Sequence, residues 1–247
     1  MRKKVKSVAL SLLFLTLSFL LAFLVYLYFG ASEDKEISGQ WAAEVDMTEQ
    51  AAVAALIWLQ DMEGVSVSIE DVESCMEGLT VEVDLMLKKT ARSEGTFRSY
   101  IVPESYEDCN QAAYEAFAAL FRELAGQRLR MAGYTGDTGE EAVEALVNET
   151  FGMSTVSYLM SCGPALLPSL EELQGEYDGS GTYETAEGIL TRRFEAGNAL
   201  EEKAERYIRE ETELVLIGED GAENADDYPV AYILQEPETS QVIRFAE

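Results

Sequence analysis

Residues 79–87, with the sequence LTVEVDLML, alternate apolar and polar side chains with a period of two. This alternation is typical of a β-strand that buries one face and exposes the other. Residues 96–101 (TFRSYI) provide a partner strand, and a turn that contains Glu94 and Gly95 joins the two. The sequence therefore predicts a β-hairpin over residues 79–101.

Upstream of this hairpin we expect one strand and one helix. Residues 37–46 favour a strand, and Thr48 precedes a helical stretch over residues 49–62 that ends before Gly64. One face of this helix carries the side chains of Val53, Leu56, Ile57 and Gln60.

Beyond the hairpin the apolar residues recur with the period of a helix. The stripe has the spacing i, i+3, i+4 and i+7 and consists of Ala113, Tyr114, Phe117, Leu120, Phe121 and Leu124. Thr138 and Glu141 have the spacing of a capping box that opens a second helix, and Ser169 and Glu172 repeat it before a last short helix. We therefore predict a helical insertion over about residues 104–175.

From Gly179 onward the strand pattern returns. The predicted strands cover residues 181–184, 188–194, 206–209, 213–217, 230–234 and 242–245. Glu187-Gly188 and Glu210-Glu211 provide tight turns between them. Short strands at regular spacing with turn residues between them favour an antiparallel meander that forms a barrel or sandwich. The expected fold class is α+β, an antiparallel barrel or meander with a helical insertion.

A membrane anchor is predicted at the N-terminus. Four basic residues are followed by an uncharged run whose apolar core covers residues 8–29. A helix of this length measures about 33 Å, and the hydrocarbon layer is about 30 Å thick. Glu33, Asp34 and Glu36 follow the run, so the positive-inside rule places the N-terminus in the cytoplasm and the main domain outside. A cleaved signal peptide is the alternative, although its apolar region is usually only about 7–15 residues long.

The expected organisation has three parts. Residues 1–30 form the basic flank and the single transmembrane helix, residues 31–36 form a linker, and residues 37–247 form an extracytoplasmic domain that includes the helical insertion. The expected location is the cell membrane, with the main domain extracellular.

The charge and the missing histidine exclude several functions. The chain carries 18 basic and 46 acidic residues, a net charge of −28, which repels nucleic acid and anionic lipid. The sequence contains no histidine, the usual general base of serine and cysteine nucleophiles and the commonest ligand of catalytic zinc. No P-loop or dinucleotide-binding motif is present, so we expect no cofactor and no nucleic-acid partner.

A few polar motifs invite a chemical interpretation. Cys162 has no activating partner in sequence and is interpreted as structural. Residues 178–184 and 220–227 contain oxygen ligands without the spacing of a calcium loop, which favours polar turns. Arg192 and Arg193 are adjacent in a predicted strand, so they point to opposite faces and one reaches inward. Two carboxylates roughly 5–10 Å apart could hydrolyse glycans, and the abundant acids keep that alternative open.

The order of strands around a helical insertion resembles the calycin, or lipocalin-like, architecture as it occurs in small anchored proteins of Gram-positive bacteria. The resemblance is carried by Gly39, Trp41, residues 94–97 (EGTF), 181–183 (GTY) and 188–190 (GIL), and Arg244. It implies that Trp41 lies across the barrel floor with Arg244 packed on its indole ring, a favourable cation–π arrangement. The additional helices depart from a standard lipocalin, so the resemblance implies a fold and not an activity.

The three cysteines leave two interpretations open. Their number is odd, so at most one internal disulfide can form. Cys75 and Cys109 are the expected pair because each lies near one end of the predicted hairpin, and three unpaired buried thiols are the alternative.

The sequence as a whole indicates a membrane-tethered extracytoplasmic binding or interaction module that is not an enzyme. Its expected partners are the membrane, through the N-terminal helix, and either a small apolar ligand or an envelope protein. The alternative is a carboxylate-based hydrolase that acts on envelope or dietary glycans.

Overall fold

The alternating apolar and polar side chains of residues 79–87 lie in the central β-hairpin of the barrel. The computed structural model describes residues 36–60, 66–198, 200–218 and 230–235. Strand β2 (Thr80–Lys89) pairs with β3 (Glu94–Ile101), and Val83 lies opposite Ile101. This confirms the predicted hairpin. The chain reverses at residues 90–93, where the N–H groups of Thr90 and Ala91 donate to the carbonyl of Glu94 at 3.0 Å, so Glu94 and Gly95 belong to the strand and not to the turn.

Eight strands form a closed antiparallel barrel in which each strand pairs with its neighbour in sequence and β8 pairs with β1. The remaining strands are β1 (Gly39–Asp46), β4 (Gly179–Ala186), β5 (Ile189–Phe194), β6 (Glu202–Arg209), β7 (Glu213–Gly218) and β8 (Val230–Leu234). This is the predicted meander, closed into a barrel. The strand expected at residues 242–245 lies outside the described residues.

The β4–β5 turn illustrates how local chemistry sets the strand order. Glu187 has φ 55° and Gly188 has φ 79°. Two central residues with positive φ are the requirement of the type I′ turn, whose twist matches that of an antiparallel hairpin. The predicted turn at Glu187-Gly188 is therefore confirmed.

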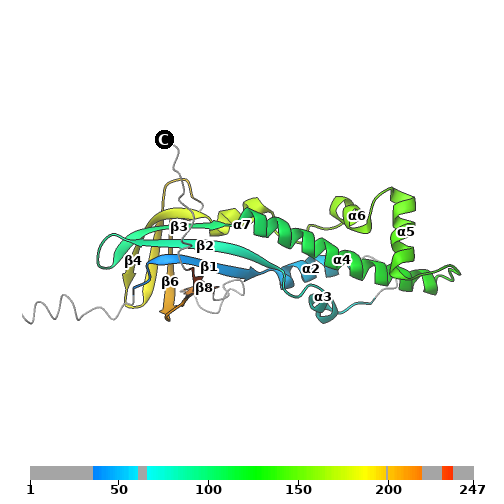
Figure 1. Ribbon diagram of the computed structural model, residues 1–247, viewed down its shortest axis with the longest axis horizontal. Coiled ribbons are helices and arrows are strands. Elements are labelled where there is room, and N and C mark those ends of the chain that lie inside the picture. Colours follow the sequence, from blue (N-terminus) through cyan, green and yellow to red (C-terminus); the bar gives the residue numbers. More distant parts are fainter. Residues whose placement is uncertain (1–35, 61–65, 199, 219–229, 236–247) are drawn as a thin grey trace, which may run out of the picture.

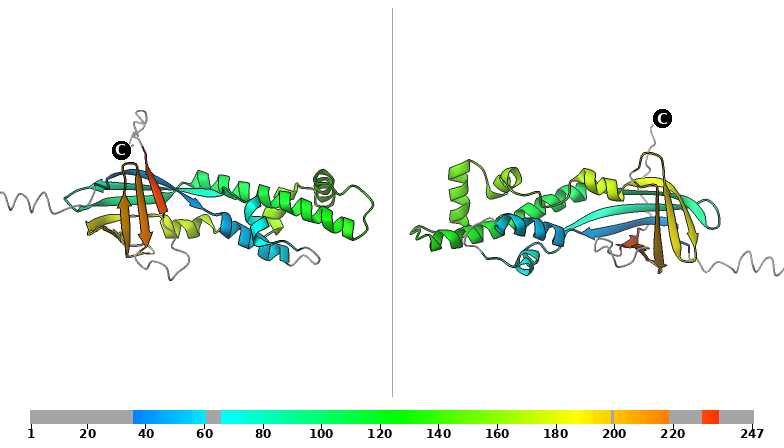
Figure 2. Two further views of the ribbon diagram at one scale, coloured as in Figure 1. Left: turned by 90° about the horizontal axis from the view of Figure 1, so that it is seen from below. Right: turned by 180° about the vertical axis from the view of Figure 1, so that it is seen from behind.

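Six helices lie among the described residues. They are α2 (Thr48–Gln60), α3 (Ile69–Cys75), α4 (Pro103–Met131), α5 (Glu140–Phe151), α6 (Thr155–Cys162) and α7 (Leu170–Tyr177). Helices α4–α7 form the predicted insertion. The 29 residues of α4 give it a length of about 44 Å. Figure 1 shows that α2–α6 extend from one end of the barrel as a helical arm, and the views in Figure 2 agree.

Two predicted capping boxes have different outcomes. Ser169 and Glu172 form a complete box at the start of α7. The box expected from Thr138 and Glu141 is wrong, because α5 begins one residue later and Gly139 is its N-cap. The backbone carbonyl of Thr138 lies against Gly126 of α4, where an added Cβ would come within 2.2 Å of it. This contact between helix and loop fixes the start of α5.

Helix α2 is apolar on most of its surface, and Val53 and Ile57 lie on its outer face. Val53 is 41% exposed and Ile57 is 62% exposed. The buried face consists of Ala51, Ala52, Ala55 and Leu59. The ring of Trp58 lies edge-on to Phe117 of α4 at 5.6 Å between centroids. Three small alanines and Leu59 thus face the core, whereas Val53 and Ile57 face outward.

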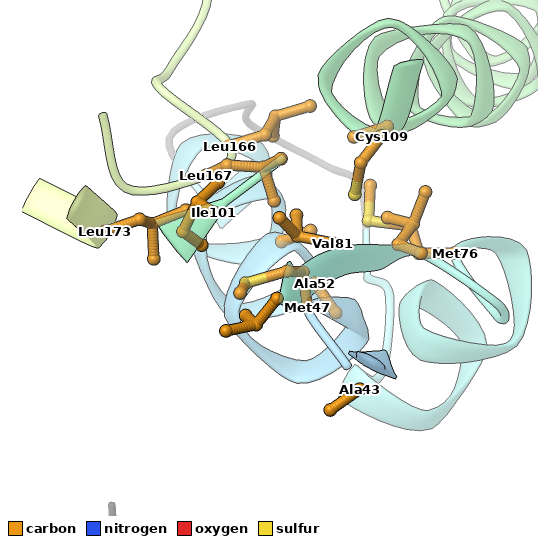
Figure 3. Packing of buried hydrophobic residues seen from close by; sticks show 14 of the residues in the cluster. Ala43, Met47, Ala52, Met76, Val81, Ile101, Cys109, Leu166, Leu167 and Leu173 are labelled. Atoms are coloured by element: carbon orange, nitrogen blue, oxygen red, sulfur yellow. The ribbon is translucent and has the colours of Figure 1, made fainter. Parts of the chain in front are cut away.

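The barrel core continues into the arm. Figure 3 shows Val81 and Ile101 from the strands packed with Met47, Met76 and Leu166 from the loops beside the helices. Each of these side chains is at most 3% exposed. The apolar stripe predicted on α4 lies in this core as expected, so barrel and arm share one hydrophobic cluster.

Among the helices that the structure describes, none is both long enough and apolar enough to cross a bilayer. The predicted anchor at residues 8–29 lies outside the described residues.

Candidate functional site

The inside of the barrel is filled by large side chains. Trp41, Leu85, Leu190 and Leu214 are each at most 1% exposed. Gly95 faces inward on β3, and the ring of Tyr183 lies so close that an added Cβ would approach it to 2.3 Å. An eight-stranded barrel is about wide enough for its own side chains or for one small ligand. In the described strands, the barrel's own side chains occupy most of the interior.

An ion pair lies inside this apolar interior. Arg192 of β5 donates from Nε and Nη2 to Oε2 of Glu205 on β6, at 3.0 and 2.7 Å, and the side chains of both are 7% exposed. Lys203 approaches the other carboxylate oxygen of Glu205 at 3.3 Å. The guanidinium of Arg192 also lies 5.5 Å from the centroid of the Phe97 ring. Such a pair tolerates burial because its partners satisfy each other.

The pattern on β5 confirms that two adjacent arginines face opposite ways. Arg192 is buried, whereas Arg193 is exposed and bridges to Glu202 at 2.9 Å and to Glu184 at 3.5 Å. Glu205 was missed by sequence reasoning. Residues 203–205 carry no apolar alternation that would extend the strand predicted at 206–209, although β6 begins at Glu202.

A cation from β6 lies above Trp41. Arg209 at the end of β6 places its guanidinium carbon 4.7 Å from the centroid of the indole ring. The resemblance implied this role for Arg244, which lies outside the described residues. Trp41 itself is buried as expected, and its Nε1–H donates to the carbonyl of Ile37 at 2.9 Å.

The chain enters the barrel at a defined end. Glu36, the first described residue, forms an ion pair with Lys89 at the end of β2, and Ile37 is buried. Strand β1 then runs from this end toward α2, and β3 runs from the β2–β3 turn toward α4. The segment that follows the predicted anchor therefore joins the barrel opposite the helical arm (Figure 1).

The three cysteines are free thiols, so the expected Cys75–Cys109 bridge is not formed. Cys75 ends α3 and is exposed, whereas Cys109 lies within α4 and is buried. Burial, with a smaller effect of the Asp46 charge, raises the pKa of Cys109 to about 11. Cys162 at the end of α6 is exposed. Because the thiol of Cys109 is held neutral by its raised pKa, Cys109 is a poor nucleophile and metal ligand.

Carboxylates outside the barrel do not assemble a metal centre. Within the described ranges, no group of three or more cysteine or acidic side chains could hold a metal ion. Asp178 instead ends α7 and accepts a hydrogen bond from the Ile101 N–H at 2.7 Å, which is a structural role. The motif at residues 220–227 lies outside the described residues.

One acidic patch lies on the outer face of β1 and β2. Glu44 lies opposite Glu82 in the register, and Asp84 follows two residues later on the same face. Partial burial raises the pKa of Glu82, and the charges of Asp84 and Glu44 raise it further. The Tyr100 hydroxyl donates to Asp84 Oδ2 at 2.6 Å, and this bond raises the pKa of Tyr100 to about 12.

The eight-stranded antiparallel closed barrel is consistent with a calycin-like fold. No protein family model matches the chain, and searches among curated proteins and solved structures give no significant match.

Proposed function

We propose that the protein is a membrane-tethered, extracytoplasmic interaction module without enzymatic activity, and that its helical arm carries the surface for an envelope protein. In this proposal residues 8–29 form a single transmembrane anchor with the N-terminus in the cytoplasm. The calycin-like relationship implied by Gly39 and Trp41 is part of the same proposal, with the barrel serving as a scaffold.

One observation carries the proposal. The segment that leads from the predicted anchor is held at the β2–β3 end of the barrel by the Glu36–Lys89 ion pair and by buried Ile37. The arm leaves the opposite end, and α4 alone is about 44 Å long. The tether joins one end of the barrel and the arm leaves the other end, so the barrel separates the arm from the anchor. This is the geometry expected of a protein that reaches a partner at a distance from the membrane.

The barrel interior supports a small apolar ligand less well. Its inward positions are occupied by Trp41 and by aliphatic and tyrosine side chains, and the Arg192–Glu205 pair lies among them. An apolar ligand in that place would have to displace packed side chains. This displacement would cost free energy, because the interior is already close-packed.

Site-specific photo-crosslinking in the source cells tests the proposal. A crosslinking amino acid is placed at exposed arm positions, Glu123 and Ser157, and at exposed barrel positions, Arg206 and Ile208, in the full chain. We expect a discrete protein adduct from the arm positions and none from the barrel positions. Adducts from the barrel positions alone, or none from the arm, would contradict the proposal.

A carboxylate-based hydrolase is the second candidate because Glu82 and Asp84 lie on the same face of β2, and because partial burial raises the pKa of Glu82, as a general acid needs. The test is glycan hydrolysis by the purified full chain, compared with Glu82→Gln and with Glu187→Gln as a control at the β4–β5 turn. Turnover that is lost only in Glu82→Gln would replace the first proposal.

A further inference from the structure

Helix α2 turns an apolar face outward. Val53 is 41% exposed and Ile57 is 62% exposed, Leu56 is half-buried, and Gln60 is exposed. Their spacing of i, i+3, i+4 and i+7 places all four side chains on one face of the helix. We name these four residues the α2 outer face. The opposite side of α2 is buried in the core, and a helix that is apolar on both sides is typical of one that is enclosed on both sides.

The α2 outer face carries no charge. The only charged residue of α2 is Glu49, in the first turn, where the helix dipole favours an acid. The whole chain has a net charge of −28, so a second copy is repelled by most of its surface. On the α2 outer face the second copy would meet aliphatic side chains and one amide. An amide both donates and accepts hydrogen bonds, so Gln60 can pair with Gln60 of a second copy.

The residue types of this face are those of a parallel helix pair. Val53 and Gln60 are seven residues apart, and Leu56 lies between them with the spacing of heptad positions a, d and a. A β-branched residue at position a and leucine at position d favour two parallel strands, and a single polar residue at position a fixes the register. In that register Val53 of one copy lies opposite Val53 of the other.

The tether favours the same arrangement. In the proposed function every copy enters the barrel at the end where Glu36 pairs with Lys89, and the arm leaves the other end. Helix α2 runs along the arm in both views of Figure 2. Two copies in one membrane therefore present α2 at the same distance from the anchor and in the same direction. A twofold axis along the arm would bring the two faces together.

We propose that the α2 outer faces of two copies pack in parallel and form a homodimer in the membrane, an inference that rests on the tether of the proposed function. Helix α2 is about 20 Å long, so the contact is smaller than the roughly 800 Å² per partner of a stable complex. Confinement of both copies to one membrane raises their effective concentration and compensates for the small contact. The dimer presents two arms side by side.

Energy transfer between labelled chains in phosphatidylcholine liposomes tests the proposal. The full chain carries Cys75→Ser and is labelled at Cys162, which is exposed, with either a donor or an acceptor dye. Cys109 is buried and remains unlabelled. We expect transfer between the two populations that decreases when unlabelled chain is added in excess.

Charged variants at one position locate the contact. Val53→Glu and Val53→Lys each place like charges opposite each other, so each variant alone should associate about tenfold or more weakly. A mixture of the two variants places opposite charges together and should restore the transfer. Restoration also shows that both variants fold. Ile208→Glu and Ile208→Lys, at a position of the barrel that is 49% exposed, are the matched controls and should change association by less than about twofold.

Three results would overturn the inference. The first is no transfer between wild-type chains, and the second is an equal loss in the Val53 and Ile208 variants. The third is a loss in both Val53 variants that their mixture does not restore, which is the result expected if α2 packed on lipid or in the antiparallel sense.

The two proposals can fail separately. Flotation of the liposomes reports the tether, photo-crosslinking in cells reports the envelope partner, and energy transfer reports the α2 pair. A chain that floats with the liposomes and shows no transfer would refute the α2 pair alone. Transfer that depends on Val53, together with no arm adduct in cells, would support the pair and count against the envelope partner. A chain that does not float would contradict the tether and, with it, the parallel pair.

Discussion

The guanidinium of Arg209 lies over the indole ring of Trp41, with 4.7 Å from its central carbon to the ring centroid. The two residues come from β6 and β1, which are not neighbours in the barrel. The contact therefore crosses the barrel interior and joins opposite walls. A desolvated cation–π pair of this kind contributes about 2 kcal/mol.

Removal of the indole should be costly. Trp41 is 1% exposed, packs under Arg209 and donates a hydrogen bond to Ile37. We expect Trp41→Ala to lower the free energy of unfolding by about 3–5 kcal/mol, which is typical of a buried aromatic side chain. Urea denaturation followed by circular dichroism measures it. An unchanged midpoint would contradict the position of Trp41 inside the barrel.

The buried ion pair gives a prediction about single and double variants. Among the described residues, Arg192→Met leaves Glu205 with Lys203, whose side chain is 35% exposed, as its cationic partner, and should cost about 3–5 kcal/mol of stability. Arg192→Met/Glu205→Leu removes both charges and should recover most of that loss. The comparison is made by denaturant unfolding. A double variant that is no more stable than Arg192→Met would contradict the prediction.

The parts of the fold with local signals could be predicted from sequence. The β2–β3 hairpin follows from strict alternation, and the β4–β5 turn follows from Glu187-Gly188, because both signals lie within a few residues. The stripe on α4 and the capping box of Ser169 with Glu172 are local as well. These elements need no tertiary information.

The features that no local signal predicts depend on tertiary contacts. Gly139 replaces Thr138 as N-cap because the Thr138 carbonyl packs on Gly126, a residue on another helix. Arg209 reaches Trp41 only because closure of the barrel brings β6 opposite β1.

The thiols can be distinguished by their accessibility. Cys75 and Cys162 are exposed, whereas Cys109 is buried and its pKa is raised to about 11. We expect two thiols per chain to react with a thiol reagent at pH 8 in the native state, and a third to react only after unfolding. One reactive thiol in the unreduced, unfolded chain would instead show that two of the three cysteines form a disulfide.

Gly126 gives a test of how the arm is assembled. A Cβ at this position would lie 2.2 Å from the Thr138 carbonyl oxygen, which must then move. We expect Gly126→Ala to destabilise the arm by about 1–3 kcal/mol, as overpacking does, while the barrel is retained. Hydrogen exchange should accelerate in α5 and α6 and remain unchanged in β2 and β3. Gly175→Ala, where an added Cβ meets nothing within 4 Å, is the matched control.

Alkaline pH should unfold the chain through buried groups that lose protons. Burial raises the pKa of Tyr232 to about 12 and that of Cys109 to about 11, whereas the ordinary values are 10.0 and 9.0. The folded state therefore holds these protons more tightly than the unfolded state. The resulting stability is fully present below about pH 9 and is lost progressively as the pH rises toward 12. Denaturant unfolding between pH 7 and pH 11 measures the decline.

The variant Tyr232→Phe isolates one of these groups. Phenylalanine retains the ring inside the barrel and has no proton to lose, so the decline in unfolding free energy above about pH 10 should become shallower. Tyr134→Phe, at a position that is 49% exposed, is the control and should leave the decline unchanged. Identical pH dependence in wild type and Tyr232→Phe would mean that the hydroxyl of Tyr232 reaches solvent, which is incompatible with its position on the inner face of β8.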